Sequence, residues 1–140
     1  MKLTGWIGIL FFLVTVLVVT SCQSNEQLEF NRYYSQGSSI YRAKCQNCHG
    51  SHGEGLQGLI PPLTDSIYLK TSIASLACSV KYGLKGKIAI SGRLFEGEMP
   101  PNDLASIEIA EVLTYVTNSF GNKMGTLNSA NADTYLENCK

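Results

Sequence analysis

The sequence has no excess of charge of either sign and no basic run. Its 140 residues include 11 Lys+Arg and 11 Asp+Glu, and the positive residues are scattered along the chain. A protein that binds nucleic acid usually gathers its lysines and arginines on one face. The composition therefore argues against nucleic acid as a partner.

Strand signals and internal repeats are almost absent, so the sequence predicts an all-α fold. Helices are expected at residues 34–46, 66–82 and 106–121, with Ser106 as the cap of the third and Gly121 as its end. Residues 84–101 are expected to be irregular, and a short helix is expected at 132–138. The second and third helices carry apolar residues at i, i+3, i+4 and i+7, namely Ile73, Leu76, Ala77 and Val80, and Ile109, Val112, Leu113 and Val116.

No apolar run is long enough to cross a bilayer as a helix. Residues 5–19 are apolar except for one Thr, and these fifteen residues fall short of the ~20 that a membrane-spanning helix needs. With Lys2 before it, the run is typical of a targeting signal. Val19-Thr20-Ser21-Cys22 resembles the lipobox of bacterial lipoproteins, which implies cleavage before Cys22 and lipid attachment to its sulfur. An uncleaved anchor helix ending near Ser21 is the alternative.

The most informative feature that is present is the run Cys45-Gln46-Asn47-Cys48-His49. C-x-x-C-H is the attachment signature of c-type haem. The two thiols can each add to one vinyl group of a haem, and the histidine can then give a nitrogen to the iron as an axial ligand. The sequence predicts one covalent haem c attached through Cys45 and Cys48, with His49 as an iron ligand.

Two other uses of a C-x-x-C pair fit the surroundings less well. A thioredoxin-like dithiol calls for a preceding strand and a βαβ setting, whereas residues 38–44 have helical character. A zinc site needs about four ligands at suitable spacing, and Cys78, Cys139 and His52 form no second pair motif.

The chain has only two histidines and three methionines, which limits the second axial ligand. His52 is too close in sequence to His49 to reach the other face of a haem. Met1 would leave with the signal, and Met124 lies in a polar tail. Met99, in Glu98-Met99-Pro100-Pro101, lies on an expected loop whose prolines restrict its conformation. We therefore expect His49 and Met99 to hold the iron, a combination that raises the reduction potential. The alternative role for Met99 is to fill a gap in the core.

Cys78 and Cys139 remain once the other three cysteines are assigned. A single pair of thiols in an oxidising compartment is expected to form a disulfide. This bond would tie the C-terminal tail to the middle of the domain. Two separate thiols are the alternative.

Together these residues resemble class I cytochromes c, specifically the small single-haem bacterial forms. The resemblance covers residues 34–121. It includes Gly37 and Tyr41 before the attachment motif and the loop from Gly50 to Leu63. It also includes the approach to Met99 that begins at Gly92 and the pair Val112 and Tyr115.

The resemblance implies three main helices around one covalently bound haem, and close crossing of the first and last helices at Gly37. It also implies that the carbonyl of Pro61, or of Pro62, accepts a hydrogen bond from His49. Arg93 is expected near a haem propionate, or else as an ordinary solvated arginine.

The expected organisation follows from these assignments. Residues 1–21 form a lipoprotein signal peptide, 22–33 a flexible tether, 34–121 the cytochrome c domain, and 122–140 a C-terminal extension packed on it. The protein is expected to be lipid-anchored to a membrane of the bacterial cell envelope, facing the periplasm or exterior.

The resemblance and the two filled axial positions predict an electron-transfer protein of a respiratory chain, not an enzyme. Its expected partners are an oxidase, reductase or dehydrogenase, and it would act as a monomer or as a subunit of a respiratory complex. Lys81, Lys85 and Lys87 could steer an acidic partner, or could be an ordinary solvated run. The alternative function is a peroxidase-like enzyme, haem subunit or sensor with an open or displaceable sixth iron position.

Overall fold

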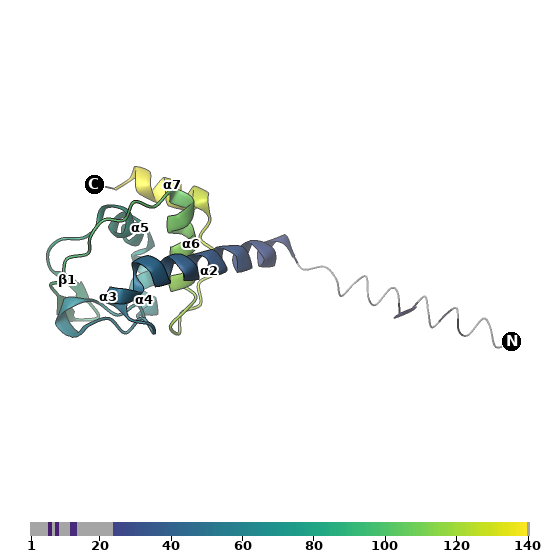
Figure 1. Ribbon diagram of the computed structural model, residues 1–140, viewed down its shortest axis with the longest axis horizontal. Helices are drawn as coiled ribbons and strands as arrows, with labels where there is room; N and C mark the ends of the chain where they lie inside the picture. The colour runs from purple at the N-terminus through teal and green to yellow at the C-terminus, as the bar shows by residue number, and fades with distance from the viewer. Residues whose placement is uncertain (1–5, 7, 9–11, 14–23, 140) are drawn as a thin grey trace.

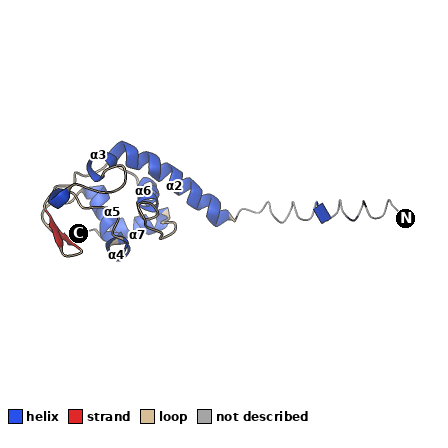
Figure 2. Ribbon diagram, turned by 90° about the horizontal axis from the view of Figure 1, so that it is seen from below, coloured by secondary structure: helices blue, strands red, loops and turns tan. Residues whose placement is uncertain are grey.

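Helices dominate the computed structural model, which describes residues 6, 8, 12, 13 and 24–139 (Figures 1 and 2). The predicted signal peptide, apart from those four positions, and Cys22 lie outside the described residues. Within the described part of the chain, no helix combines the length and the apolar character needed to span a bilayer. The elements in chain order are α2 (Asn25–Lys44), α3 (Gln46–His49), the 3-10 helix η1 (Gln57–Leu59), α4 (Ser66–Thr71), α5 (Ile73–Tyr82), β1 (Ile88–Ile90), β2 (Arg93–Phe95), α6 (Ser106–Val116) and α7 (Ser129–Glu137).

The first helix starts earlier than the sequence predicted. The prediction of a flexible tether over residues 22–33 is wrong for residues 25–33, because α2 already begins at Asn25. The Ser24 side chain accepts a hydrogen bond from the Gln27 amide, and Glu26 lies in the first turn, where the helix dipole favours it. Tyr33 is buried with Ala110 and Ala132, so tertiary packing supports this turn of the helix. In Figure 1 the first turns of α2 extend beyond the other helices, towards the N-terminus.

Helices α2 and α6 cross in close contact (Figure 1). Gly37 is buried at the crossing, and a Cβ atom on it would lie 1.9 Å from the carbonyl oxygen of Glu111. Aromatic rings surround this point: the Tyr115 centroid lies 5.1 Å from that of Tyr34 and 5.3 Å from that of Tyr41. The missing side chain of Gly37 therefore lets the two backbones approach while the aromatic rings pack beside them.

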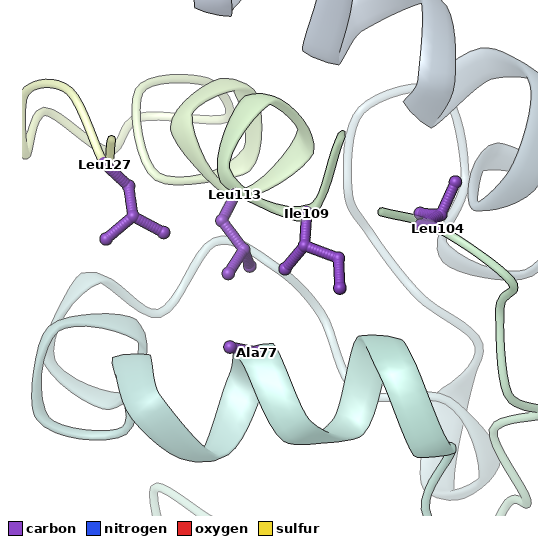
Figure 3. Packing of buried hydrophobic residues seen from close by; sticks show 5 residues of the cluster. All are labelled: Ala77, Leu104, Ile109, Leu113 and Leu127. Carbon is purple, nitrogen blue, oxygen red and sulfur yellow. The ribbon is translucent and has the colours of Figure 1, made fainter. Parts of the chain in front are cut away.

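The apolar face of α6 also packs on α5. Ala77 of α5 faces Ile109 and Leu113 of α6, with Leu104 and Leu127 completing the cluster (Figure 3). A second cluster centres on Tyr41, Leu69, Val112 and Val116 and adjoins the first, because Ile40, Leu76 and Val80 pack against both. The amphipathic pattern predicted for both helices thus faces the core as expected.

The predicted bounds of the second and third helices are wrong. Residues 66–82 do not form one helix, since the chain leaves helical geometry at Ser72. The hydroxyl of Thr71 donates to the carbonyl of Ile67, four residues earlier, a type of bond that often bends a helix. The N-cap position of helix α6 is Ala105, not Ser106. The Ala105 amide donates to the Glu108 carboxylate. The helix ends at Val116 and not at Gly121.

A short hairpin occupies part of the segment that was expected to be irregular. Strands β1 and β2 pair antiparallel, with Ile88 opposite Phe95 and Ile90 opposite Arg93. Ser91 and Gly92 both have positive φ, 50° and 77°, as a two-residue type I′ turn requires. The all-α prediction therefore misses a minor sheet, although helix remains the dominant structure.

The C-terminal residues fold back on the helical core. Helix α7 packs against α5 and α6, with Ala132 fully buried and Tyr135 and Leu136 against the Ala77 cluster. Cys78 on α5 and Cys139 after α7 are joined by a disulfide. Near the start of this segment, the Thr114 hydroxyl donates to the Leu127 carbonyl and accepts from the Leu127 amide. These two bonds and the disulfide hold the segment on both sides of α7.

Candidate cofactor cleft

The attachment motif lies at a bend between two helices. Helix α2 ends at Lys44, and Cys45 leads directly into the short helix α3. The amides of Cys48 and His49 both donate to the carbonyl of Cys45, at 3.1 and 2.9 Å. This single turn places Cys45, Cys48 and His49 on one side, as spacings of three and four residues do in a helix. Both thiols are unpaired.

The imidazole of His49 is oriented by Pro61. Its Nδ1 lies 3.1 Å from the Pro61 carbonyl oxygen, which can only accept, so Nδ1 carries the proton and donates. Burial lowers the pKa of His49, and the Pro61 bond opposes this change. The neutral ring therefore keeps a free lone pair on Nε2, the atom that binds a metal in this tautomer.

Two adjoining pockets form one cleft beside this histidine, with about 660 and 730 Å³ of empty space that is partly open to solvent. Apolar residues of α4, α5 and α6 line the second of these pockets, among them Leu69, Leu76, Val80, Val112 and Val116. Six residues line both pockets: Cys45, His49, Pro61, Leu84, Ile88 and Met99.

The residues of the cleft fit a covalent haem. An apolar wall suits a macrocycle, two unpaired thiols stand beside it, and an imidazole nitrogen and a thioether line the same space.

Burial, with a contribution from Cys48, raises the pKa of the Cys45 thiol to about 11. This change is opposite to the lowered pKa of a reactive dithiol, and a helix precedes the motif, so the thioredoxin-like alternative is not supported. Among the described residues, no cluster of His, Cys, Asp or Glu could form a metal site of the zinc type.

The segment around Met99 is held by its backbone. Leu84 and Met99 exchange two amide-to-carbonyl hydrogen bonds of 2.8 and 2.9 Å. Gly83 adopts a φ of 78°, and a Cβ there would lie 2.5 Å from the Met99 carbonyl oxygen. Met124, the other methionine considered, packs on the second core cluster and lines neither pocket of the cleft.

Other predicted residues lie outside the cleft. Arg93 is exposed on the hairpin, with its guanidinium 6.0 Å from the Phe95 ring centroid, and it lines a separate depression with Pro62 and Asp65. His52 is exposed on the loop after α3, and its amide donates to the Glu54 carboxylate.

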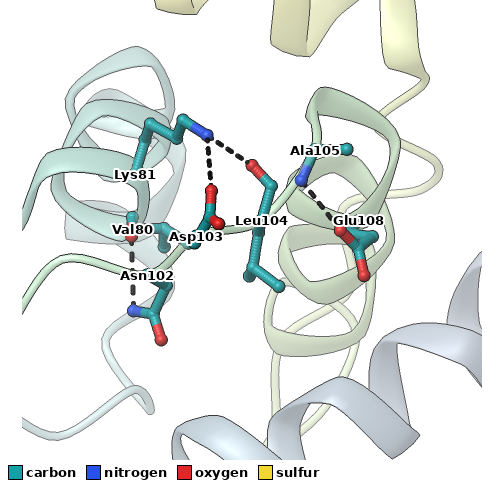
Figure 4. A network of polar contacts seen from close by, with 7 residues as sticks. All are labelled: Val80, Lys81, Asn102, Asp103, Leu104, Ala105 and Glu108. Carbon is teal, nitrogen blue, oxygen red and sulfur yellow. Dashed lines mark hydrogen bonds and ion pairs between the residues drawn. The ribbon is translucent and has the colours of Figure 1, made fainter.

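The three lysines considered for partner steering each face an acidic residue. Lys85 pairs with Glu98 at 3.0 Å, and Lys87 pairs with Glu96 at 2.7 Å. Lys81 donates to the Leu104 carbonyl and lies 3.8 Å from Asp103 (Figure 4). These pairs leave little net positive charge on this side of the molecule.

The structure also shows two sets of hydrogen bonds that the sequence did not predict, one made by Tyr41 and one by Asn122. The Tyr41 hydroxyl donates to the Gly50 carbonyl at 2.6 Å and so fixes the start of the loop after His49. Burial, followed by the nearby Cys45, raises the Tyr41 pKa and keeps this donor protonated. The Asn122 amide donates to the carbonyls of Leu63 and Val116, and its oxygen accepts from Ser66. Nothing in the sequence around Asn122 indicates this role.

One comparison with known proteins matches most of this region. The family model described as cytochrome c oxidase, cbb3-type, subunit III matches residues 33–116, more than half of the chain. The match includes the C-x-x-C-H motif, Pro61 and Met99. No curated protein sequence matches the chain.

Proposed function

Because the chain belongs to the family of cbb3-type cytochrome c oxidase subunit III, and is therefore a c-type cytochrome, we propose that it carries single electrons with a His49/Met99-ligated haem. The family implies a covalently bound haem c with iron. That group supplies one-electron Fe(II)/Fe(III) chemistry when it is bound. The chain holds it through thioether bonds at Cys45 and Cys48.

The observation that carries the proposal is that His49 and Met99 line one cleft. The Pro61 carbonyl holds the His49 ring so that Nε2 is free. The two backbone hydrogen bonds between Leu84 and Met99, here called the Leu84 bridge, fix the backbone of Met99. If both residues bind the iron, a small molecule must displace one of them before it can react. This favours a carrier over a peroxidase-like enzyme or a gas sensor, which need an open sixth position.

The location and partners form part of the same proposal. Lipid attachment to Cys22 would anchor the protein to a membrane of the bacterial envelope, on the periplasmic or outer side. Only Gln23 and Ser24 separate Cys22 from the start of α2 in the sequence. The family name refers to an oxidase, so a terminal oxidase is the partner class we favour within a respiratory chain.

Substitution of Met99 tests the ligand assignment. We expect the oxidised wild-type protein to show the long-wavelength sulfur–iron charge-transfer band. We expect Met99→Ala to lose that band, to bind carbon monoxide in the reduced state and to have a lower reduction potential. Met124→Ala is the matched control and should keep the band, because Met124 lies outside the cleft.

Two results would contradict the proposal. A wild-type protein that lacks the band and binds carbon monoxide readily would favour the alternative with an open iron. A Met99→Ala variant that keeps the band would show that another residue binds the sixth position.

The lipid assignment is tested separately: Cys22→Ala should release the protein from membranes and leave its absorption spectrum unchanged.

A further inference from the structure

The segment that carries Met99 is joined by its backbone to the loop that carries Pro61. The Gly97 amide donates to the Leu59 carbonyl at 2.8 Å, and the Glu96 amide donates to the Gly58 carbonyl at 3.0 Å. We call this pair of bonds the Leu59–Gly97 link. Leu59 lies two residues before Pro61, and Gly97 lies two residues before Met99.

The link needs a glycine at position 97 for reasons of space. A Cβ atom on Gly97 would lie 2.2 Å from the Leu59 carbonyl oxygen and 3.0 Å from its carbonyl carbon. Gly97 does not have the positive φ that restricts other glycines of the chain, so its backbone conformation alone would accept another residue. Any side chain must therefore push the two loops apart, because both contacting atoms belong to the backbone.

The link completes a short path between the two proposed ligands. The path runs from the His49 ring to the Pro61 carbonyl, along two residues to Leu59, across to Gly97, and along two residues to Met99. Every connection between the loops is a hydrogen bond to a backbone carbonyl. Since such bonds lose strength steeply when distances and angles change, a shift of one loop is transmitted to the other.

We propose that the Leu59–Gly97 link positions Met99 relative to His49, and that Gly97 is a positioning residue for the sixth iron ligand. The inference rests on the proposed function, in which Met99 binds the iron. Met99 has a flexible side chain with three rotatable bonds, so its sulfur competes with other ligands only if its backbone is fixed. The Leu84 bridge fixes one side of that backbone, and the link fixes the segment that leads into it.

Gly97→Ala in the holoprotein is the direct test. We expect the variant to lose the sulfur–iron band while its haem stays covalently attached and His49 stays bound. The affinity of the oxidised protein for added imidazole should rise by about tenfold or more, which corresponds to about 1.4 kcal/mol.

Gly86→Ala and Gly92→Ala are the matched controls on the same segment. At neither glycine would an added Cβ meet another atom within 4 Å, but both have positive φ, 96° and 77°. These variants strain the backbone without a collision at the link, so they should lower stability and leave the band and the imidazole affinity unchanged.

A second measurement uses the wild-type protein and does not depend on the folding of a variant. Coupling between two sites is reciprocal, so if the link favours Met99 ligation, ligation must favour the link. We expect the amide protons of Glu96 and Gly97 to exchange faster with solvent when imidazole displaces Met99. The Leu127 amide, which is bonded to Thr114, is the reference and should not change.

The outcomes separate this inference from the proposed function. A wild-type protein without the sulfur–iron band would mean that the ligand assignment has failed. A wild-type protein with the band, together with a Gly97→Ala variant of unchanged band and imidazole affinity, would overturn only the role of Gly97. Unchanged exchange at Glu96 and Gly97 on imidazole binding would also overturn it.

Discussion

Gly37 shows how one missing side chain fixes the crossing of two helices. We expect Gly37→Ala to lower the free energy of unfolding by about 1–3 kcal/mol, the usual cost of forcing extra atoms into a packed site. The added Cβ would lie 1.9 Å from the Glu111 carbonyl oxygen and 2.9 Å from the Tyr115 Cβ. Alanine is better than glycine in a helix by up to ~1 kcal/mol, so the collision must outweigh a favourable backbone effect. Guanidinium unfolding of the holoprotein measures the change.

Ser39→Ala is the control for this substitution, since Ser39 is exposed on the same helix two residues later. Its stability should stay within about 0.5 kcal/mol of the wild type. Equal stabilities for the Gly37 variant and the control would show that α2 and α6 can separate without cost.

Residues whose partners are near in sequence could be predicted directly, whereas distant pairings were predicted only through the resemblance, as for Gly37, or by elimination, as for Cys78 and Cys139. The haem motif is readable because its chemistry lies within five residues, and the resemblance supplied the roles of Gly37 and Pro61. Asn122 was missed because its partners Ser66 and Leu63 lie 56 and 59 residues away. Gly97 was missed for the same reason, since the Leu59 backbone that excludes a side chain is distant in sequence.

At the scale of elements, helices with a clear apolar stripe were located well, but their ends were not. The stripes on α5 and α6 depend on side-chain period, which the sequence contains. The early start of α2 depends on the burial of Tyr33 against Ala110 and Ala132, which belong to elements far along the chain. The β1–β2 hairpin is only three residues per strand, too short for alternation to stand out.

The disulfide between Cys78 and Cys139 gives a prediction about α7. We expect the double variant Cys78→Ser/Cys139→Ser to lose up to about 4 kcal/mol of stability, because the bond closes a loop with a sequence separation of 61 residues. Amides of α7 should lose protection from exchange first, since α7 packs on α5 and α6 as an outer helix. Thermal unfolding and hydrogen exchange provide the measurements.

The sulfur–iron band serves as the internal control for the disulfide variant. Neither cysteine lines the cleft, so the band should be unchanged in the folded variant. Wild-type protein treated with a reductant that opens the disulfide should behave like the variant. Equal melting temperatures and equal protection of α7 would mean that packing alone holds the tail.

At the scale of the whole molecule, opposite charges alternate on the side that carries the lysines. The chain has a formal net charge of zero, and Lys85 and Lys87 lie within 3.0 Å of Glu98 and Glu96. At a distance of one Debye length, about 10 Å at 0.1 M salt, such a pair exerts almost no field. This arrangement argues against long-range steering of an acidic partner by these lysines, and favours association through close contact.

Oxidation of the reduced protein by ferricyanide, a trivalent anion, tests this view of the surface. We expect Glu96→Gln/Glu98→Gln to unmask two positive charges beside the cleft and to raise the rate at low ionic strength by up to about tenfold. The increase should disappear in high salt. Asp133→Asn/Glu137→Gln on α7 is the matched control: it changes the net charge equally, but its two residues do not line the cleft, so a smaller effect is expected. Stopped-flow absorbance measures both rates. Equal acceleration in the two variants would mean that total charge, not the local pairing of lysines with glutamates, governs approach to the haem.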